Sequence, residues 1–326
     1  MEERIIMNTI ANKSKIHKRF ETGSNMKKII YKQRYLFMMV LPVVIIVTIF
    51  SYVPVFGWLI AFKDYRPGRD ILSADWIGLK QFKMFFLDSK DALYIFRNTL
   101  SINILCLIFN LTFACMFAIL VNEIKSNKIK SIIQTFSLFP FFISWVVVYS
   151  IYTVFFSVNS GVINIFLINI GVIKEGINLL GDPKYAWGLM VITALWKSMG
   201  YNAIIFLASI SGIEQEQYEA AEIDGAGRWG RMWYITLPGL KSTFIVLLIL
   251  TSGSLLSTDF DKYYLFTNPT NIEKMEVFDM YTYRYGMKLA NFSYSTAVSM
   301  MKTIISIGML LGVNTLSKKV TERSLF

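Results

Sequence analysis

Six long apolar blocks, separated by charged connections, constrain this chain more than any other feature of its sequence. The first block, 36–61, runs for 26 residues without a charged side chain. As a helix it would be about 39 Å long, enough to cross the roughly 30 Å hydrocarbon core of a bilayer. It is also longer than the apolar core of a cleaved signal peptide, which has roughly 7–15 residues, so we expect a retained membrane span.

The other five blocks predict five further spans. Their expected ranges are 93–121, 132–156, 186–211, 242–258 and 292–316. Only 17% of the 326 residues are charged, against about a quarter in a typical soluble domain. The missing charge lies in these blocks, so the sequence predicts an all-α, polytopic integral membrane protein with six transmembrane helices.

Basic residues beside the blocks predict orientation, because short loops rich in Lys and Arg stay in the cytoplasm. The tail 1–35 has nine Lys or Arg against three acidic residues, and the link 122–131 and the tail 317–326 have three basic residues each. We expect both termini in the cytoplasm and the loop 62–92 outside, although that loop has six basic residues. The N-terminal flank decides this conflict, since the first span usually dominates. The net charge of +11 then suits membrane lipid headgroups rather than nucleic acid.

The connection 212–241 is too polar to span a membrane and too patterned for a plain linker. Residues 215–224 are rich in Ala and Glu, which favours a short helix, and Gly225 can end that helix in the left-handed conformation. A second helix is expected, with one face formed by Trp229, Met232, Trp233 and Thr236. Pro238 should break it before the fifth span. The sequence predicts a helix–turn–helix on the inner membrane surface.

Catalytic and metal-binding patterns are missing from the sequence. It has no GxxxxGK[ST], GxSxG or HExxH pattern; His17 is the single histidine, and Cys106 and Cys115 form no CxxC pair. The apolar blocks also have no Asp or Glu between their ends, whereas ion-coupled carriers commonly place a carboxylate near the midplane. We expect a transporter subunit that is not an enzyme, binds no cofactor or metal of its own, and is driven by a partner.

Three groups of residues resemble a known family. The run Tyr218-Glu219-Ala220-Ala221-Glu222-Ile223-Asp224-Gly225-Ala226, followed by Ile235-Thr236-Leu237-Pro238, resembles the EAA loop of binding-protein-dependent ABC importer permeases. Upstream, Trp196-Lys197-Ser198-Met199-Gly200 and Leu207-Ala208 resemble the preceding span in carbohydrate importers of the maltose-transporter type. Tyr281-Thr282-Tyr283-Arg284 and Arg323-Ser324-Leu325-Phe326 look like the LplB/YteP group of polysaccharide and oligosaccharide permeases. Two positions depart from the pattern: Glu214 replaces a common proline, and Met232 a common phenylalanine.

The resemblance, which covers roughly 90–326, implies a permease core over 93–316 and a partner for the connection 212–241. That segment would seat in a cleft of an ATPase subunit, with Ala220 and Ala221 allowing close approach and Glu219 accepting a charge-assisted hydrogen bond. The implied coupling residues are Tyr218, Glu219, Ala220, Ala221, Asp224, Gly225, Ala226, Leu237 and Pro238. ATP and Mg would be bound by the ATPase pair. A second permease subunit and an extracytoplasmic solute-binding protein complete the implied assembly.

Candidate substrate-pathway residues are aromatic, amide and hydroxyl side chains within the blocks, because sugars are held by such groups. They are Trp145, Tyr149, Tyr201, Asn202, Ser254 and Ser257. Helix packing is the alternative role for each of them. Lys197 and Lys302 should face protein or water, because a charge in hydrocarbon is costly.

The resulting prediction is a permease subunit of an ATP-driven importer of carbohydrates, oligosaccharides or polysaccharide fragments. The outer segment Asp75-Trp76-Ile77-Gly78-Leu79, which resembles a segment of carbohydrate permeases, is expected to help seat the binding protein. Three alternatives stay open: a permease for a non-sugar solute, a stand-alone membrane carrier, and a membrane-embedded transferase.

Overall fold

A computed structural model describes residues 31, 33–88 and 91–321 of the chain. The chain divides into two compact units, 1–59 and 60–326. The terminal segments 1–30 and 322–326 lie outside the described residues, and with them most of the basic N-terminal tail and the sequence Arg323-Ser324-Leu325-Phe326. In the described part of the chain the regular structure is helical, and the single β pairing is an isolated bridge between Lys63 and Trp76.

The described residues of the first unit form one apolar helix. Helix α3 (Arg34–Val47) continues through a π-helical turn, η2 (Thr48–Tyr52), into η3 (Val53–Phe62), and Arg34–Phe62 is long and apolar enough to cross a membrane. Pro42 lies inside α3, and none of the residues of α3 is buried. A helix that is apolar on all sides and has no buried residue over Arg34–Val47 suits a lipid environment.

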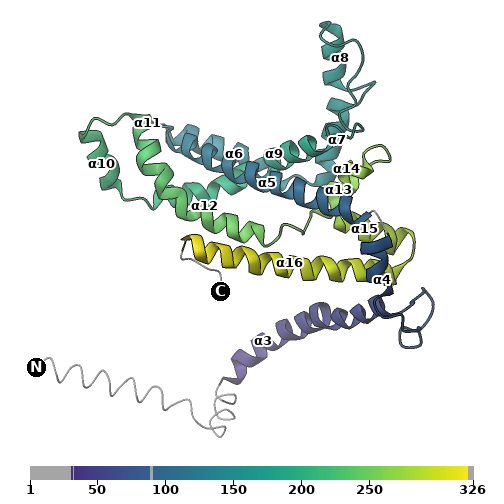
Figure 1. The fold of residues 1–326 in the computed structure, drawn as a ribbon. Coiled ribbons are helices and arrows are strands. Elements are labelled where there is room, and N and C mark those ends of the chain that lie inside the picture. The colour runs from purple at the N-terminus through teal and green to yellow at the C-terminus, as the bar shows by residue number, and fades with distance from the viewer. Residues whose placement is uncertain (1–30, 32, 89–90, 322–326) are drawn as a thin grey trace, which may run out of the picture. The chain divides into compact units, whose positions relative to one another are not determined.

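The second unit is a bundle of long helices with short helices at both ends (Figure 1). The long helices are α5 (Asp91–Asn122), α6 (Asn127–Phe142), α7 (Trp145–Phe156), α9 (Ala186–Ser211), α12 (Leu237–Ser252) and α16 (Phe292–Thr321). The short elements are α4 (Lys80–Lys83), η4 (Met84–Asp88), α8 (Val162–Asn169), α10 (Gln215–Ile223), α11 (Arg228–Arg231), η5 (Met232–Thr236), α13 (Phe260–Phe266), α14 (Ile272–Met275), α15 (Phe278–Tyr283) and η6 (Arg284–Lys288).

Helix α5 holds the second unit together, because it contributes to all three of its buried apolar clusters. Ile102 packs with residues of α9, α13 and α14, Ile95 with residues of α15 and α16, and Ala114 with residues of α9 and α12. Helix α9 also lies very close to α6. A Cβ atom on Gly200 would sit 2.0 Å from the carbonyl oxygen of Ser137, so this approach requires glycine.

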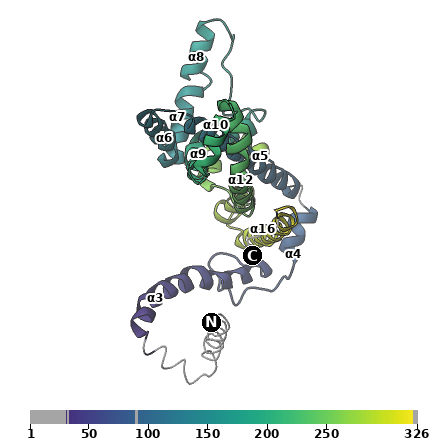
Figure 2. The ribbon, with the colours of Figure 1, turned by 90° about the vertical axis from the view of Figure 1, so that its left-hand side faces the viewer.

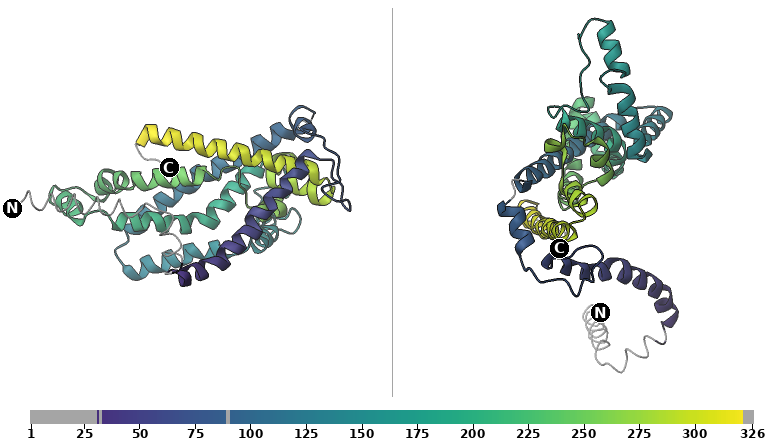
Figure 3. Two further views of the ribbon diagram at one scale, coloured as in Figure 1. Left: turned by 90° about the horizontal axis from the view of Figure 1, so that it is seen from below. Right: turned by 90° about the vertical axis from the view of Figure 1, so that its right-hand side faces the viewer.

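The short helices α10 and α11 lie at one end of the bundle, and α13, α14 and α15 lie at the other. Both Figure 1 and the left view of Figure 3 show this separation along the length of the helices. Helix α7 packs on the bundle through Val148, and α8 projects away from it (Figure 2). The exposed surface around α8 is largely apolar, with Phe166 61% and Val172, just after α8, 66% accessible.

The third apolar block differs from the straight span expected over 132–156. It forms α6 and α7, which meet at an angle of 98°. Pro140 weakens the last turn of α6, and Ser144 starts α7 by accepting a hydrogen bond from the backbone N–H of Val147 (3.4 Å). The described residues therefore contain five helices able to cross a membrane, or six if the bent pair is counted as one span. This agrees with a multi-pass membrane protein.

The fifth apolar helix begins earlier and ends earlier than expected. It runs from Arg228 to Ser252 without interruption, whereas the sequence predicted a break at Pro238 and a span over 242–258. The expected break is wrong because Pro238 is the second residue of α12, two positions after the last residue of the π-helical turn η5. A π-helical turn shifts the hydrogen-bond register, so the proline ring is accommodated without ending the helix.

Candidate functional site

The connection 212–241 folds as two helices joined by a tight turn. We call it the coupling segment, after the role that its sequence resemblance implies. Gly212 ends α9, and α10 follows directly after Glu214. Gly225 then adopts a φ of 76°, as the sequence predicted, and the N–H of Ala226 donates to the carbonyl oxygen of Ala221 at 2.8 Å. This is the hydrogen-bond pattern of a glycine-terminated helix, so the turn has a defined geometry.

Two side-chain contacts fix the second helix against α10. The Tyr218 hydroxyl lies 3.0 Å from Oγ1 of Thr236, which is buried at 1% exposure. Arg231 forms an ion pair with Glu222 at 3.2 Å, with the Glu222 side chain 73% exposed. An exposed pair contributes little free energy, so the Tyr218–Thr236 contact and the helical turn define the shape.

The outer surface of the coupling segment is exposed and partly apolar. Glu219, Ala220 and Asp224 are exposed, and Ile223 is 86% accessible. Ala221 and Ala226 are half-buried, while Leu237 and Pro238 are exposed where α12 begins. Ile223 is thus an exposed apolar side chain beside small residues and a carboxylate on α10.

The predicted face of the second helix is partly correct. Met232, Trp229 and Trp233 line one apolar hollow of about 390 Å³. Its other lining residues are Met116, Ile119 and Leu120 of α5, with Leu237. Thr236 instead points inward to Tyr218.

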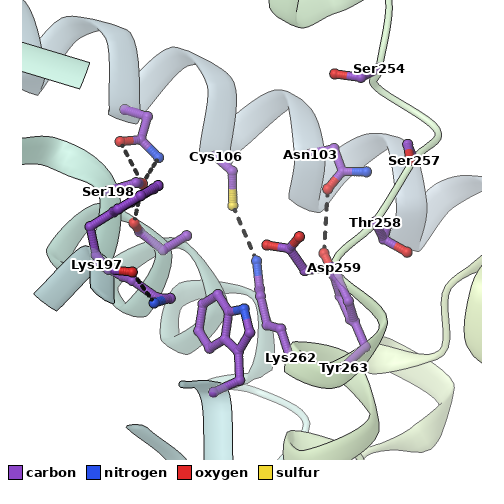
Figure 4. A pocket seen from close by; sticks show the side chains of 14 residues that line it. Asn103, Cys106, Lys197, Ser198, Ser254, Ser257, Thr258, Asp259, Lys262 and Tyr263 are labelled. Atoms are coloured by element: carbon purple, nitrogen blue, oxygen red, sulfur yellow. Dashed lines mark hydrogen bonds between the residues drawn. The ribbon is translucent and has the colours of Figure 1, made fainter. Parts of the chain in front are cut away.

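A second feature is a polar cavity of about 390 Å³ between α5, the junction of α6 and α7, α9, α13 and the connection after α12 (Figure 4). We call it the polar hollow. It is lined by Asn103, Cys106, Asn110, Phe141, Trp145, Ala194, Lys197, Ser198, Ser254, Ser257, Thr258, Asp259, Lys262 and Tyr263. A smaller hollow of about 210 Å³ adjoins it and shares Asn103, Asn110 and Ser254 with it, among other residues.

Four of the six candidate pathway residues lie at these two hollows. Trp145, Ser254 and Ser257 line the polar hollow, and Asn202 lines the adjoining one. The other two candidates pack against aromatic rings. Tyr149 meets Phe266 edge to face at 5.1 Å, and Tyr201 stacks on Phe141 at 4.1 Å.

Two asparagines of α5 form part of the polar hollow and were not singled out from the sequence. Asn103 donates to the carbonyl oxygen of Leu255 at 2.5 Å, and Asn110 donates to the Ser198 hydroxyl at 2.8 Å. They are seven residues apart in the long, mostly apolar part of α5, which places them on one face. That spacing was the available signal, because polar side chains in such a helix turn toward protein or water.

Lys197 stabilises the bend between α6 and α7. Its ammonium group donates to the carbonyl oxygens of Phe141 (2.8 Å), Pro140 (3.3 Å) and Ile143. These carbonyls lie where α6 ends, and helix ends leave such groups without intrahelical partners. The expectation that Lys197 faces protein is confirmed, and its three donors are used.

Lys302 is also held within the protein, as expected. Its ammonium group lies 2.5 Å from Asp279, which accepts further hydrogen bonds from the Thr258 hydroxyl (2.5 Å) and the Thr258 backbone N–H (3.1 Å). Thr258 lines the polar hollow. The ion pair therefore anchors the connection after α12, which forms one wall of the hollow, to α16.

The Tyr281–Arg284 sequence belongs to a buried network at the end of the bundle opposite α10. Arg284 makes two hydrogen bonds of 2.7 and 2.9 Å to Glu276, which is 1% exposed. Burial alone lowers the pKa of Arg284, but the hydrogen bonds and charge of Glu276 outweigh it, so its pKa is raised. Tyr281 donates to Asp91 at 3.0 Å, and burial raises the pKa of its phenol. These contacts fix α15 and η6 to α5.

Comparisons with known proteins agree with this architecture. Residues 110–322 match the family described as binding-protein-dependent transport system inner membrane component. Protein LplB of Bacillus subtilis (strain 168) is 41% identical over 90% of this chain and 92% of its own length. The polygalacturonan/rhamnogalacturonan transport system permease protein YteP of the same organism is 39% identical, over 90% and 91%.

A solved structure has the same fold at similar coverage. It is a bacterial ABC transporter involved in the import of the acidic polysaccharide alginate, and one of its chains has a TM-score of 0.83 and 31% identity. The match covers 91% of this chain and 99% of that one. Another structure of a bacterial alginate ABC transporter, in complex with an alginate pentasaccharide-bound periplasmic protein, matches with a TM-score of 0.82.

Proposed function

This chain belongs to the family of binding-protein-dependent transport system inner membrane components, and we propose that it is a permease subunit of an ATP-driven importer of carbohydrates. It is a transporter component, not an enzyme. Relatives that cover about nine-tenths of the chain are named for the import of polysaccharides. Oligosaccharides or polysaccharide fragments are therefore the proposed cargo.

The coupling segment is the proposed contact with the ATPase. The observation that supports this role is the geometry at its tip, where Gly225 turns the chain and leaves Glu219, Ala220 and Ile223 exposed on α10. Small side chains permit close packing, and the carboxylate can accept a charge-assisted hydrogen bond from a basic cleft. ATP and Mg are bound by the ATPase pair in this proposal, and closure of that pair displaces the segment and the helices attached to it.

The proposed orientation places the coupling segment and both termini in the cytoplasm. Helices α13, α14 and α15 then lie toward the outside, because they occupy the other end of the bundle (Figure 1). The loop 62–92 is extracytoplasmic despite its basic residues. Lys63 in this loop donates to the carbonyl oxygens of Ile71 (3.0 Å) and Leu72 (2.8 Å), so one of those charges has a structural use.

The remaining partners are a second permease subunit, a solute-binding protein and membrane lipid. The turn 75–79 is a candidate contact with the binding protein, since Trp76 stacks on Phe62 at 5.6 Å yet stays 64% exposed. The polar hollow is the proposed substrate pathway on this subunit. Its hydroxyl, amide and indole groups suit a polyhydroxylated solute.

Uptake by the reconstituted complex tests this proposal. Glu219→Lys should abolish ATP-dependent uptake of a labelled oligosaccharide, because it places a positive charge where a basic cleft is expected, while membrane insertion stays normal. Glu175→Lys, a charge reversal in the exposed loop after α8, is the matched control and should leave uptake unchanged. Normal transport by Glu219→Lys, or full uptake with a catalytically inactive ATPase, would contradict the proposal. The second result would instead favour a stand-alone carrier.

A further inference from the structure

Lys262 of α13 is a buried cation whose hydrogen-bond donors are almost unused. Its residue exposure is 5%, and its ammonium group is among the groups that line the polar hollow (Figure 4). Its one hydrogen-bond partner among the described residues is the sulfur of Cys106, at 3.9 Å. An ammonium group has three donors and a thiol is a weak acceptor, so most of the hydrogen-bonding capacity of Lys262 is free.

The other lysines of this region differ from Lys262. Lys197, in the same hollow, donates to three backbone carbonyls, and Lys302 is paired with Asp279 at 2.5 Å. Their charges are committed to the fold. Lys262 has no carboxylate within 4.0 Å among the described residues. The ring of Tyr263, 4.9 Å from the Lys262 nitrogen, stabilises the charge only in part. A buried charge without a paired carboxylate is unfavourable, so an anion entering the hollow would be stabilised there.

The formal charge of the hollow also favours an anion. Its lining has two cations, Lys197 and Lys262, and one carboxylate, Asp259. The ring of Trp145 lies between the two cations, with its centroid 5.2 Å from the Lys197 nitrogen and 5.9 Å from the Lys262 nitrogen. An indole face beside an ammonium group can receive the face of a sugar ring and the carboxylate attached to it at the same time.

We propose that Lys262 recognises the carboxylate of an acidic saccharide, and that it makes the polar hollow selective for uronate-containing oligosaccharides over neutral ones. Asp259 accepts hydrogen bonds from sugar hydroxyls on the same ligand and limits the net positive charge. This inference rests on the proposed function, because it assigns a charge class to the cargo of that importer.

The test measures uptake by the complete importer in liposomes, with tetragalacturonate and its fully methyl-esterified, uncharged form as probes. Lys262→Gln should lower kcat/KM for tetragalacturonate roughly tenfold or more, the size expected for loss of a charged hydrogen bond, and change that for the ester less than about twofold. Lys262→Arg should retain most of the preference. Asp259→Asn should lower KM for tetragalacturonate about threefold, since it removes a like charge beside the ligand.

Lys274→Gln is the matched control, because Lys274 also lies over an indole, that of Trp187 at 5.6 Å, but outside the hollow. Lys274→Gln should leave kcat/KM unchanged for both substrates. If Lys262→Gln lowered kcat/KM equally for both substrates, Lys262 would be a purely structural cation and the inference would be overturned. Wild-type import of the ester at the rate of tetragalacturonate, or above it, would overturn the inference and leave the proposed function intact. Failure of ATP-dependent import for both probes would overturn the two together.

Discussion

The coupling segment and the polar hollow are built in opposite ways. The polar side-chain contacts within the coupling segment are local: Tyr218 meets Thr236 18 residues away, and Glu222 meets Arg231 nine residues away. The contacts of the polar hollow join distant parts of the chain, since Asn103 bonds Leu255 152 residues away and Lys262 meets Cys106 156 residues away. A substitution in the first region should therefore change docking, and one in the second should change packing or selectivity.

The two regions also differ in which side chains they leave available to a partner or a ligand. The coupling segment exposes whole side chains such as Ile223, at 86%, which a protein partner can cover. The polar hollow is largely self-satisfied, because its amides and Lys197 are bonded to neighbouring helices. Lys262 is an exception among the described residues, since its donors face the cavity. The first arrangement suits a transient mechanical contact, and the second suits recognition of a small polar ligand.

The largest effect should come from Gly225→Pro. Its φ of 76° is incompatible with proline, and its N–H donates to the carbonyl of Glu222 at 3.1 Å, so the turn would be lost. Uptake should fall to background while the protein still inserts into the membrane, as measured by transport and membrane fractionation. Gly225→Asn, which tolerates this conformation, should keep most activity. Gly227 has a φ of −69°, so Gly227→Ala should be harmless; equal loss in Gly227→Ala would show that the turn geometry is irrelevant.

An intermediate effect is expected at the ion pair of Lys302 and Asp279. Both side chains are mostly buried, at 18% and 25% exposure, so Lys302→Met leaves a poorly solvated carboxylate. We expect a loss of about 2 kcal/mol in the stability of the purified complex, measured by thermal unfolding. Adding Asp279→Asn should recover part of the loss, because the uncompensated charge is removed. Additive destabilisation by the two changes would contradict the pairing.

The smallest effect should come from Tyr218→Phe. It removes the hydroxyl that contacts Thr236 at 3.0 Å and leaves the ring in place, which costs about 1 kcal/mol. Uptake should fall less than threefold, because the turn at Gly225 still holds the helices together. Tyr234→Phe, at a position that is 84% exposed, is the control and should have no effect. If Tyr218→Phe lowered uptake more than Gly225→Asn, the Tyr218–Thr236 contact would matter more than the turn at Gly225, contrary to this account.

The difference between local and distant contacts explains which features the sequence predicted. The Gly225 turn, the inward Lys197 and Lys302, and the long apolar helices all follow from short patterns or from the cost of charge in lipid. The bend of 98° after Pro140 could not be predicted from local sequence. It depends on carbonyl groups at the end of α6 that accept hydrogen bonds from Lys197, which lies on α9. The uninterrupted helix through Pro238 depends on the adjacent π-helical turn, a register change without a sequence signature.

The polar hollow was the least predictable feature. Trp145, Ser254 and Ser257 were candidates by residue type alone, whereas Asn103, Asn110 and Lys262 acquire their positions through packing of α5, α9 and α13. Tyr149 and Tyr201 were equally reasonable by type, yet they pack on Phe266 and Phe141. Residue type cannot separate these two groups, because only the tertiary arrangement decides which faces of the helices meet the cavity.

Site-specific cross-linking tests most directly whether the coupling segment contacts the ATPase. With Cys106 and Cys115 replaced by serine, Ile223→Cys should cross-link to the ATPase subunit in the assembled importer and resist a membrane-impermeant thiol reagent added outside intact cells. Val172→Cys, 66% exposed and located just after α8, should give the opposite result in both assays. Labelling of Ile223→Cys from outside, or cross-linking of the ATPase through Val172→Cys instead, would contradict the account.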